Sequence, residues 1–155
     1  MFSFINKKSG IISPAKGVLK SIEKVNDEAF ASRSLGDGFA IEPVDNRIIS
    51  PVNGTIVFIA NELHAFGIQC DNGVELLIHI GIDTVLLKGQ GFKSYIKENQ
   101  DVKQGDLLMT VDFENIKDKV VATDVIVMAT SGEKCKINEE GKLVEVGQKK
   151  IVEFR

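Results

Sequence analysis

An Asn-Gly pair at positions 72 and 73 separates two apolar runs, and it constrains the fold more than any other feature of the chain. Asn-Gly between β-prone runs is the strongest short signal of a β-hairpin, because a type I′ turn needs positive φ at both central residues. With Asn72 and Gly73 as the two loop residues, Asp71 faces Val74 across the hairpin. A slip of one residue would turn the side chains of one strand to the opposite face, so this register is open to a direct structural test.

The chain has only two histidines, His64 and His79, and they lie in the two strands of this hairpin. In the predicted register His79 faces Phe66 and His64 faces Gly81. Because side chains alternate along a strand, the even positions 64–70 then share a sheet face with the odd positions 75–81. The imidazoles become diagonal neighbours with backbones roughly 7–8 Å apart. Both ring edges could reach one small group between them.

Short apolar segments separated by turn residues recur along the rest of the chain. They lie at 38–41, 48–49, 55–60, 65–68, 74–82, 107–111, 125–128 and 151–154. Helical periodicity is weak, and only residues 92–99 and 114–120 are expected to form short helices of a turn or two. The predicted fold is therefore all-β, an antiparallel β-sandwich or barrel with one or two short helical turns.

Two pairs of segments resemble each other within the chain. Residues 13–22 resemble residues 50–59, and residues 102–106 loosely match residues 144–148. In each pair a turn precedes a strand. This pattern predicts repeated hairpins in one sheet system and is too irregular for a solenoid.

Length and charge narrow the class of protein. The 155 residues carry a net charge of −3, which gives no basic field for nucleic acid. We expect a short flexible N-terminal tail at residues 1–10 and a single domain at residues 11–155. No apolar run approaches the roughly 20 residues that span a bilayer, and the N-terminus lacks the order of a signal peptide. We therefore expect a cytoplasmic protein in which Cys70 and Cys135 are reduced.

The histidine pair suggests its own chemistry. Neutral imidazole is a good nucleophile near neutral pH, because its unperturbed pKa is about 6.5. One ring can accept a phosphoryl group while the N–H of the other stabilises the charge, so the pair predicts attack by His79 with support from His64. Catalytic zinc is the competing hypothesis. Such a site needs three protein ligands, and only Asp83 or Glu62 lies near the pair. A satisfied, partly buried structural histidine is the third alternative.

Acidic residues lie close to the pair in the predicted register. Asp83 faces Glu62, and two carboxylates across a ladder are destabilising unless a cation lies between them. An arginine or lysine of a partner could supply that cation. Alternatively the hairpin has ended at this point and both side chains point into water. Asp27 precedes Phe30 in a stretch that, taken alone, indicates an ordinary loop.

The block His79-Ile80-Gly81-Ile82-Asp83-Thr84-Val85 is specific enough to indicate a family. The stretches 35–43, 50–56, 64–68, 73–78, 88–92 and 102–106 continue the match in one register. On these residues the chain resembles the glucose-type enzyme IIA component, the IIA type-1 domain, of the bacterial phosphoenolpyruvate-dependent sugar phosphotransferase system. The resemblance implies an antiparallel β-sandwich with a shallow active face.

The resemblance also implies a phosphocarrier. The chain would accept a phosphoryl group from the histidine carrier protein on Nε2 of His79, with His64 in support, and pass it to the IIB domain of a glucose-type permease. The docking surface would include the acids Asp83 and Asp27 and an apolar rim of Phe30, Leu35 and Phe66. No cofactor is required, although relatives can share a zinc ion between the two histidines and a regulatory partner.

Two features depart from the family pattern. Glu62 stands where family members usually carry threonine, so we expect either that Glu62 points away from the site or that transfer is slower. Residues 1–8 are too few for an amphipathic membrane tail. A non-catalytic regulatory binding domain with the same fold is the alternative function. A lipoyl-type carrier would need a lysine at a hairpin tip, and the sequence shows none. The sequence leaves open which sugar is transported, whether other proteins are regulated and whether the chain is free-standing.

Overall fold

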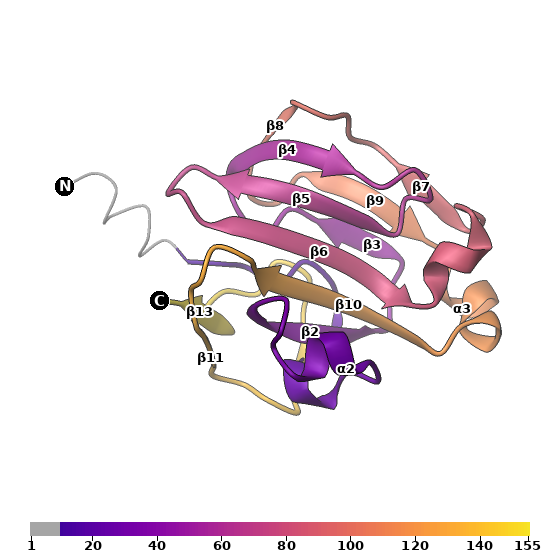
Figure 1. The fold of residues 1–155 in the computed structure, drawn as a ribbon, viewed down its shortest axis with the longest axis horizontal. Coiled ribbons are helices and arrows are strands. Elements are labelled where there is room, and N and C mark those ends of the chain that lie inside the picture. The colour runs from indigo at the N-terminus through magenta and orange to yellow at the C-terminus, as the bar shows by residue number, and fades with distance from the viewer. Residues whose placement is uncertain (1–9) are drawn as a thin grey trace.

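The computed structural model describes residues 10–155, which form an antiparallel β-sandwich (Figure 1). The larger sheet has the strand order β12-β1-β2-β10-β6-β5-β4-β8. Its strands are β1 (Gly17–Ser21), β2 (Asp37–Pro43), β4 (Gly54–Ile59), β5 (Ala65–Cys70), β6 (Glu75–Ile82), β8 (Asp101–Val102), β10 (Ala122–Ala129) and β12 (Leu143–Val144). A second sheet, of order β3-β9-β7, contains β3 (Arg47–Ile49), β7 (Phe92–Ser94) and β9 (Leu107–Val111), and β11 (Cys135–Ile137) pairs with β13 (Val152–Phe154). The predicted fold class is confirmed.

Helical structure is confined to short segments in the described part of the chain. They are η1 (Ile22–Lys24), α2 (Glu28–Ala31), η2 (Thr84–Leu87), α3 (Phe113–Ile116) and η3 (Lys117–Lys119). The helix expected at residues 114–120 is confirmed by α3 and η3. The helix expected at residues 92–99 is wrong. There β7 pairs with β9 and buries Phe92 in the core, and this tertiary packing outweighs a weak helical pattern.

The main core lies between the two sheets. Phe66 and Ile68 of β5, Ile78 and Ile80 of β6 and Leu108 of β9 are completely buried there. The opposite face of the larger sheet carries a smaller apolar cluster beneath η1 and α2. It consists of Ile22, Val25, Phe30, Ala40, Ile82, Ile126 and Met128. Because both faces of β10 are covered, its apolar run is continuous instead of alternating.

The resemblances within the sequence correspond to a repeat in the structure. Ile12 N–H donates to the Pro51 carbonyl over 3.2 Å, and Ile49 N–H donates reciprocally to the Pro14 carbonyl over 2.9 Å. Strand β1 pairs with β12 as β4 pairs with β8. The two similar segments therefore occupy equivalent places in the larger sheet, although the strands that they pair with are distant in sequence and do not form the predicted hairpins.

The hairpin of β5 and β6 forms where Asn72 and Gly73 predicted it, but its register differs by one residue. Phe66 faces Ile78 instead of His79. Cys70 N–H donates to the Val74 carbonyl over 2.8 Å, so the loop has three residues, and Gly73 alone among them has positive φ, at 94°. A three-residue loop with glycine at its left-handed position is the next most common hairpin connection after the two-residue turn. The predicted sharing of faces between the strands is therefore wrong.

Some expectations fall at or beyond the described N-terminus. The predicted flexible tail, residues 1–10, lies outside the described residues except for Gly10, so the division at residue 10 stays a prediction. Both cysteines are unpaired, and no helix within residues 10–155 is long and apolar enough to cross a membrane.

Candidate functional site

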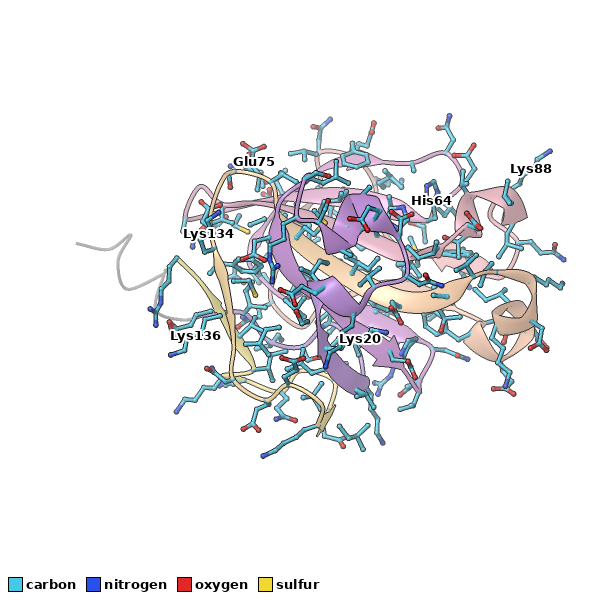
Figure 2. All side chains as sticks on the ribbon, turned by 60° about the horizontal axis from the view of Figure 1, so that its bottom comes forward. Lys20, His64, Glu75, Lys88, Lys134 and Lys136 are labelled. Atoms are coloured by element: carbon cyan, nitrogen blue, oxygen red, sulfur yellow. The ribbon has the colours of Figure 1, made fainter. Side chains whose placement is uncertain are left out.

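His79 lies near the end of β6, on the outer face of the larger sheet. It faces Ala65 in β5 and Ile126 in β10, and Ile126 belongs to the outer apolar cluster. A shallow hollow of about 190 Å³ opens on this face. Its lining consists of Asp27, Phe30, His64, His79, Ile82, Asp83 and Val85. In Figure 2, His64 lies toward the end of the molecule that carries Lys88, away from Glu75 near the hairpin turn.

The imidazoles of His64 and His79 meet edge to face. Their ring centroids are 5.2 Å apart and their planes are inclined by 84°. His64 precedes β5 and follows Leu63, whose φ of 66° departs from extended geometry, so His64 is not held to the side-chain alternation of β5. The His64 carbonyl accepts a hydrogen bond from Ile80 N–H over 2.7 Å, which fixes the backbone beside β6. The rings therefore meet although the predicted register does not hold.

Phe30 packs on His79 from α2. The ring centroids are 4.9 Å apart, and the Phe30 side chain is buried in the outer cluster. Asp27 caps the N-terminus of α2 by accepting a hydrogen bond from Ala29 N–H over 2.9 Å. This helical turn therefore brings an aromatic ring and a carboxylate to the same side of the hollow.

The turn after β6 shapes the other side of the hollow. Gly81 has a φ of 74°, and a Cβ at this position would lie 2.4 Å from the Thr84 methyl carbon, so only glycine fits. The buried Thr84 hydroxyl donates to the Ile80 carbonyl over 2.5 Å. Asp83 then adopts a left-handed φ of 67° at the start of η2. Sequence reasoning did not single out Thr84, and it placed Gly81 only as the residue opposite His64, although both stand in the specific block 79–85.

Burial decides the protonation of the pair. Burial, together with the neighbouring His64, lowers the pKa of His79 from 6.5 to about 4, although the Gly81 backbone and the Asp27 carboxylate oppose the shift. Burial also lowers the pKa of His64, against the opposing charge of Glu62. Both rings are therefore neutral near pH 7, which leaves each with one nitrogen lone pair.

The two nitrogens of each ring have different surroundings. Nδ1 of His64 and Nδ1 of His79 are buried, and neither has a hydrogen-bond partner among the described residues. Nε2 of each ring is not among the buried atoms that lack a partner. Nε2 is therefore the ring nitrogen of His79 that another molecule can reach.

The structure brings together some of the predicted surface residues and separates others. Asp27, Phe30 and Asp83 line the hollow, whereas Leu35 is 48% exposed outside its lining. The expectation that Phe66 lies on the exposed rim is wrong. It is completely buried in the main core, because the one-residue shift turns it toward Ile78.

Glu62 does not face Asp83 across a ladder. The paired residues of β5 and β6 end at Ala65 and His79, so both acids lie beyond the hairpin pairing. Glu62 is half-buried and does not line the hollow, yet its charge raises the pKa of His64. It is therefore close enough to act on the pair electrostatically.

No group of three or more histidine, cysteine, aspartate or glutamate side chains within residues 10–155 is arranged to hold a metal ion. The pair offers two imidazoles, and a zinc site generally takes about four ligands. A zinc ion at this hollow would therefore need ligands from another protein.

A larger cavity of about 820 Å³ lies beside the hairpin turn, at the other end of β5 and β6. Its lining includes Asn72, Gln104 and Phe154 but no histidine. Cys70 also lines it, but burial raises the pKa of its thiol to about 12, so the thiol stays protonated. The histidine pair therefore lines the smaller hollow and not the larger cavity.

Comparison with known proteins gives the family. A family model described as "phosphoenolpyruvate-dependent sugar phosphotransferase system, EIIA 1" matches residues 9–135. The chain belongs to this enzyme IIA family. It is accordingly a phosphotransferase component of a sugar transport system.

Individual relatives agree with this assignment. The chain is 44% identical over 151 residues to the "PTS system glucose-specific EIIA component" of Buchnera aphidicola, covering 96% of this chain and 93% of that protein. It is also 44% identical over 118 residues to the "PTS system N-acetylglucosamine-specific EIICBA component" of Klebsiella pneumoniae, covering 75% of this chain and 18% of that protein. Among solved structures, the glucose permease IIA of Mycoplasma capricolum matches with a TM-score of 0.79 and 39% identity, covering 92% of each chain.

Proposed function

We propose that this enzyme IIA protein carries the phosphoryl group on Nε2 of His79. The Nε2 lone pair forms a new bond to phosphorus while the bond between phosphorus and the donor nitrogen breaks, and the donor ring keeps the electron pair. The reaction needs positioning and charge stabilisation more than further covalent machinery. Nδ1–H of His79 keeps its proton throughout, so no separate base is required.

One observation carries this proposal: the neutral His79 imidazole opens into a hollow with a second imidazole 5.2 Å away. In that arrangement His64 can direct an N–H toward the oxygens of the transferred group. Such a donor stabilises the charge that spreads over those oxygens in the transition state. His64 therefore acts as the stabilising residue and His79 as the nucleophile.

The partners follow from the charge and shape of the hollow. Asp27 and Asp83 both line it and offer carboxylates to a basic donor, which we take to be the histidine carrier protein. Phe30 and Leu35 supply the apolar part of that surface. The acceptor is the IIB domain of a sugar permease, and the relative named as an EIICBA component fits such an arrangement. We expect the transfer to take place in the cytoplasm.

Identity to the relatives does not separate their sugars, because those named for glucose and for N-acetylglucosamine are both 44% identical to this chain. A zinc ion shared between the histidine pair and a regulatory partner stays a prediction, since two imidazoles leave room for ligands from a second protein. Glu62 supports a second candidate function, a regulatory binding domain that has lost transfer. Its negative charge beside His64 would oppose an approaching phosphoryl group.

Reconstituted sugar phosphorylation tests the proposal. The assay combines phosphoenolpyruvate, the general phosphotransferase enzyme, the histidine carrier protein and membranes with a glucose-type permease that lacks its own IIA domain. We expect sugar phosphate to form only when this chain is added. A chain that takes no label from phosphoenolpyruvate and forms no sugar phosphate would contradict the proposal and favour the regulatory function.

A further inference from the structure

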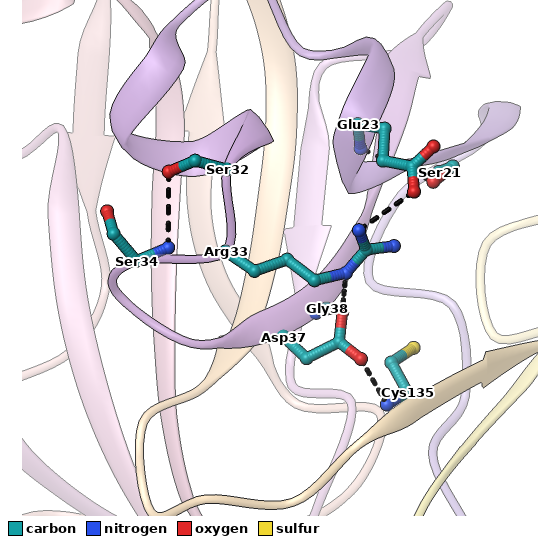
Figure 3. Close-up of polar contacts among 8 residues, drawn as sticks. All are labelled: Ser21, Glu23, Ser32, Arg33, Ser34, Asp37, Gly38 and Cys135. Carbon is teal, nitrogen blue, oxygen red and sulfur yellow. Dashed lines mark hydrogen bonds and ion pairs between the residues drawn. The ribbon is translucent and has the colours of Figure 1, made fainter.

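Residues 22–37 form a segment on the outer face of the larger sheet, and this segment places Phe30 on His79. One arginine, Arg33, joins the two ends of the segment. Arg33 Nη1 donates to Glu23 Oε1 over 2.8 Å, and Arg33 Nε donates to Asp37 Oδ1 over 2.8 Å (Figure 3). Glu23 belongs to η1, at the start of this segment, and Asp37 is the first residue of β2, at its end. The guanidinium therefore closes a loop of chain that leaves the larger sheet and returns to it.

The anchor of this contact on the sheet is firm. The Asp37 side chain is only 12% exposed, and its Oδ2 accepts from Cys135 N–H over 2.9 Å. Asp37 Oδ1 also accepts from Gly38 N–H over 2.9 Å. Burial opposes ionisation of this carboxyl, but the hydrogen bonds from Cys135, Arg33 and Gly38 outweigh it and keep the Asp37 pKa below its ordinary value. Arg33 is thus bound to a fixed carboxylate on a central part of the fold.

Burial of Ile22, Val25 and Phe30 in the outer cluster holds the closed segment on the sheet, but the segment has little regular structure of its own. Helix α2 has four residues, too few for an isolated helix to be stable in water. The chain reverses after Phe30 through Arg33 itself, which has a φ of 63° and whose N–H donates to the Phe30 carbonyl over 3.0 Å. The same segment carries Phe30, whose ring lies 4.9 Å from that of His79.

We propose that Arg33 is a positioning residue for phosphoryl transfer, because by joining Glu23 to Asp37 it holds Phe30 against the ring of His79. The inference rests on the proposed role of His79 as the phosphoryl carrier. Arg33 itself does not line the hollow. Its effect passes through α2 to the orientation and desolvation of the nucleophile.

The test compares four variants with wild type. Arg33→Gln keeps a side chain of similar reach but removes the charge, and Arg33→Lys restores the charge. Arg47→Gln is the matched control, since Arg47 also forms an exposed ion pair, with Asp45 over 3.4 Å, but lies in β3. Glu23→Gln removes the charge of one of the two partners and leaves the bond to Asp37.

The first readout is the titration of the His79 imidazole by nuclear magnetic resonance, which needs no phosphoryl transfer. Several groups act on this ring: His64, Asp27 and the Gly81 carbonyl directly, and Asp83 from the lining of the hollow. None of them is changed in the variants. Loss of Phe30 packing lets water reach the ring, so Arg33→Gln should raise the His79 pKa by about half a unit or more. Arg33→Lys should restore it at least in part, and Arg47→Gln should leave it at the wild-type value.

The second readout is the rate of phosphoryl acceptance from the carrier protein. We expect a loss of roughly 3- to 10-fold in Arg33→Gln, a smaller loss in Glu23→Gln and none in Arg47→Gln. A His79 titration in Arg33→Gln that coincides with that of wild type, with the fold intact by circular dichroism, overturns the positioning role. Failure of wild type to accept a phosphoryl group would overturn the proposed function instead, and the titration would still decide the role of Arg33.

Discussion

The rings of His64 and His79 lie edge to face with their centroids 5.2 Å apart, although His64 stands outside β5 and His79 stands within β6. One ring is therefore set by a regular strand and the other by the bend at Leu63. This division suits a nucleophile that must keep one position and a supporting group that can follow the transferred oxygens.

Replacement of the supporting ring should separate acceptance from onward transfer. His64→Gln keeps the His79 nucleophile and an N–H donor of different reach, so we expect it to accept a phosphoryl group but to pass it to IIB poorly. Rapid mixing of the phosphorylated variant with IIB, followed by quenching, measures the transfer to IIB alone. His64→Asn is measured in the same way for comparison. If His64→Gln failed at acceptance and the small amount accepted moved on at the normal rate, the two roles would be assigned wrongly.

Glu62 should slow the transfer. Its negative charge acts on His64 and opposes the approach of a phosphoryl group, whereas the threonine of family members can donate a hydrogen bond. We expect Glu62→Thr to accept a phosphoryl group several-fold faster than wild type, with Glu75→Thr as a control on an exposed acid near the hairpin turn, away from His64. Equal rates in wild type and Glu62→Thr would mean that Glu62 does not hinder transfer.

The stability of the protein should depend on pH through His79. The folded chain holds the His79 pKa near 4, against 6.5 for the ordinary side chain, so between these values the unfolded chain binds a proton that the folded chain excludes. The unfolding free energy contributed here is fully present above pH 6.5 and decreases as the pH falls toward 4. We expect the contribution at pH 5 to be smaller than at pH 7 by on the order of 1–2 kcal/mol.

Urea unfolding of wild type and His79→Gln at pH 7 and pH 5 isolates this contribution, because the other titrating groups are shared. The stability of wild type should fall more than that of His79→Gln. A parallel fall in both proteins would show that His79 titrates normally in the folded state.

Replacement of Phe66 should lower stability and replacement of Leu35 should not, although both residues were predicted on the apolar rim. Phe66 is completely buried in the main core, so Phe66→Ala should lower the unfolding free energy by about 3–5 kcal/mol. Leu35 is 48% exposed, so Leu35→Ala should change stability by less than about 0.5 kcal/mol. Denaturant unfolding checks both values. Under conditions in which both variants are folded, the Michaelis constant for the carrier protein should rise in Leu35→Ala and not in Phe66→Ala. A stable Phe66→Ala would contradict the burial.

The positions of the strands could be predicted because apolar segments and turn residues are local signals. Thr55 to Ala60 and Val125 to Met128, for example, lie within or across β4 and β10. The hairpin register could not be predicted, since Asn72-Gly73 fits both a two-residue and a three-residue loop. Only the packing of Phe66 against the second sheet selects the three-residue loop. Residues 92–99 were misassigned for a related reason, because the partner strand β9 lies far along the chain.

The histidine pair could be predicted because no other histidines compete for the role. Phe30 and Asp27 were expected at the site only through family resemblance, since a short loop followed by a four-residue helix carries no strong local pattern. The need for glycine at Gly81 depends on the Thr84 methyl group, which lies where a Cβ would be, and three-dimensional packing alone reveals this. Arg33 has no sequence signal of its own, because its two partners stand 10 residues before it and 4 residues after it.

The most direct test of the central claim is the transfer of labelled phosphate from phosphoenolpyruvate to this chain. Wild type and His79→Ala are incubated with the general phosphotransferase enzyme and the histidine carrier protein, and the label on each is followed through acid treatment, with folding checked by circular dichroism. The account predicts acid-labile label on wild type and none on His79→Ala. Label on folded His79→Ala at the wild-type level, or no label on wild type, would contradict it.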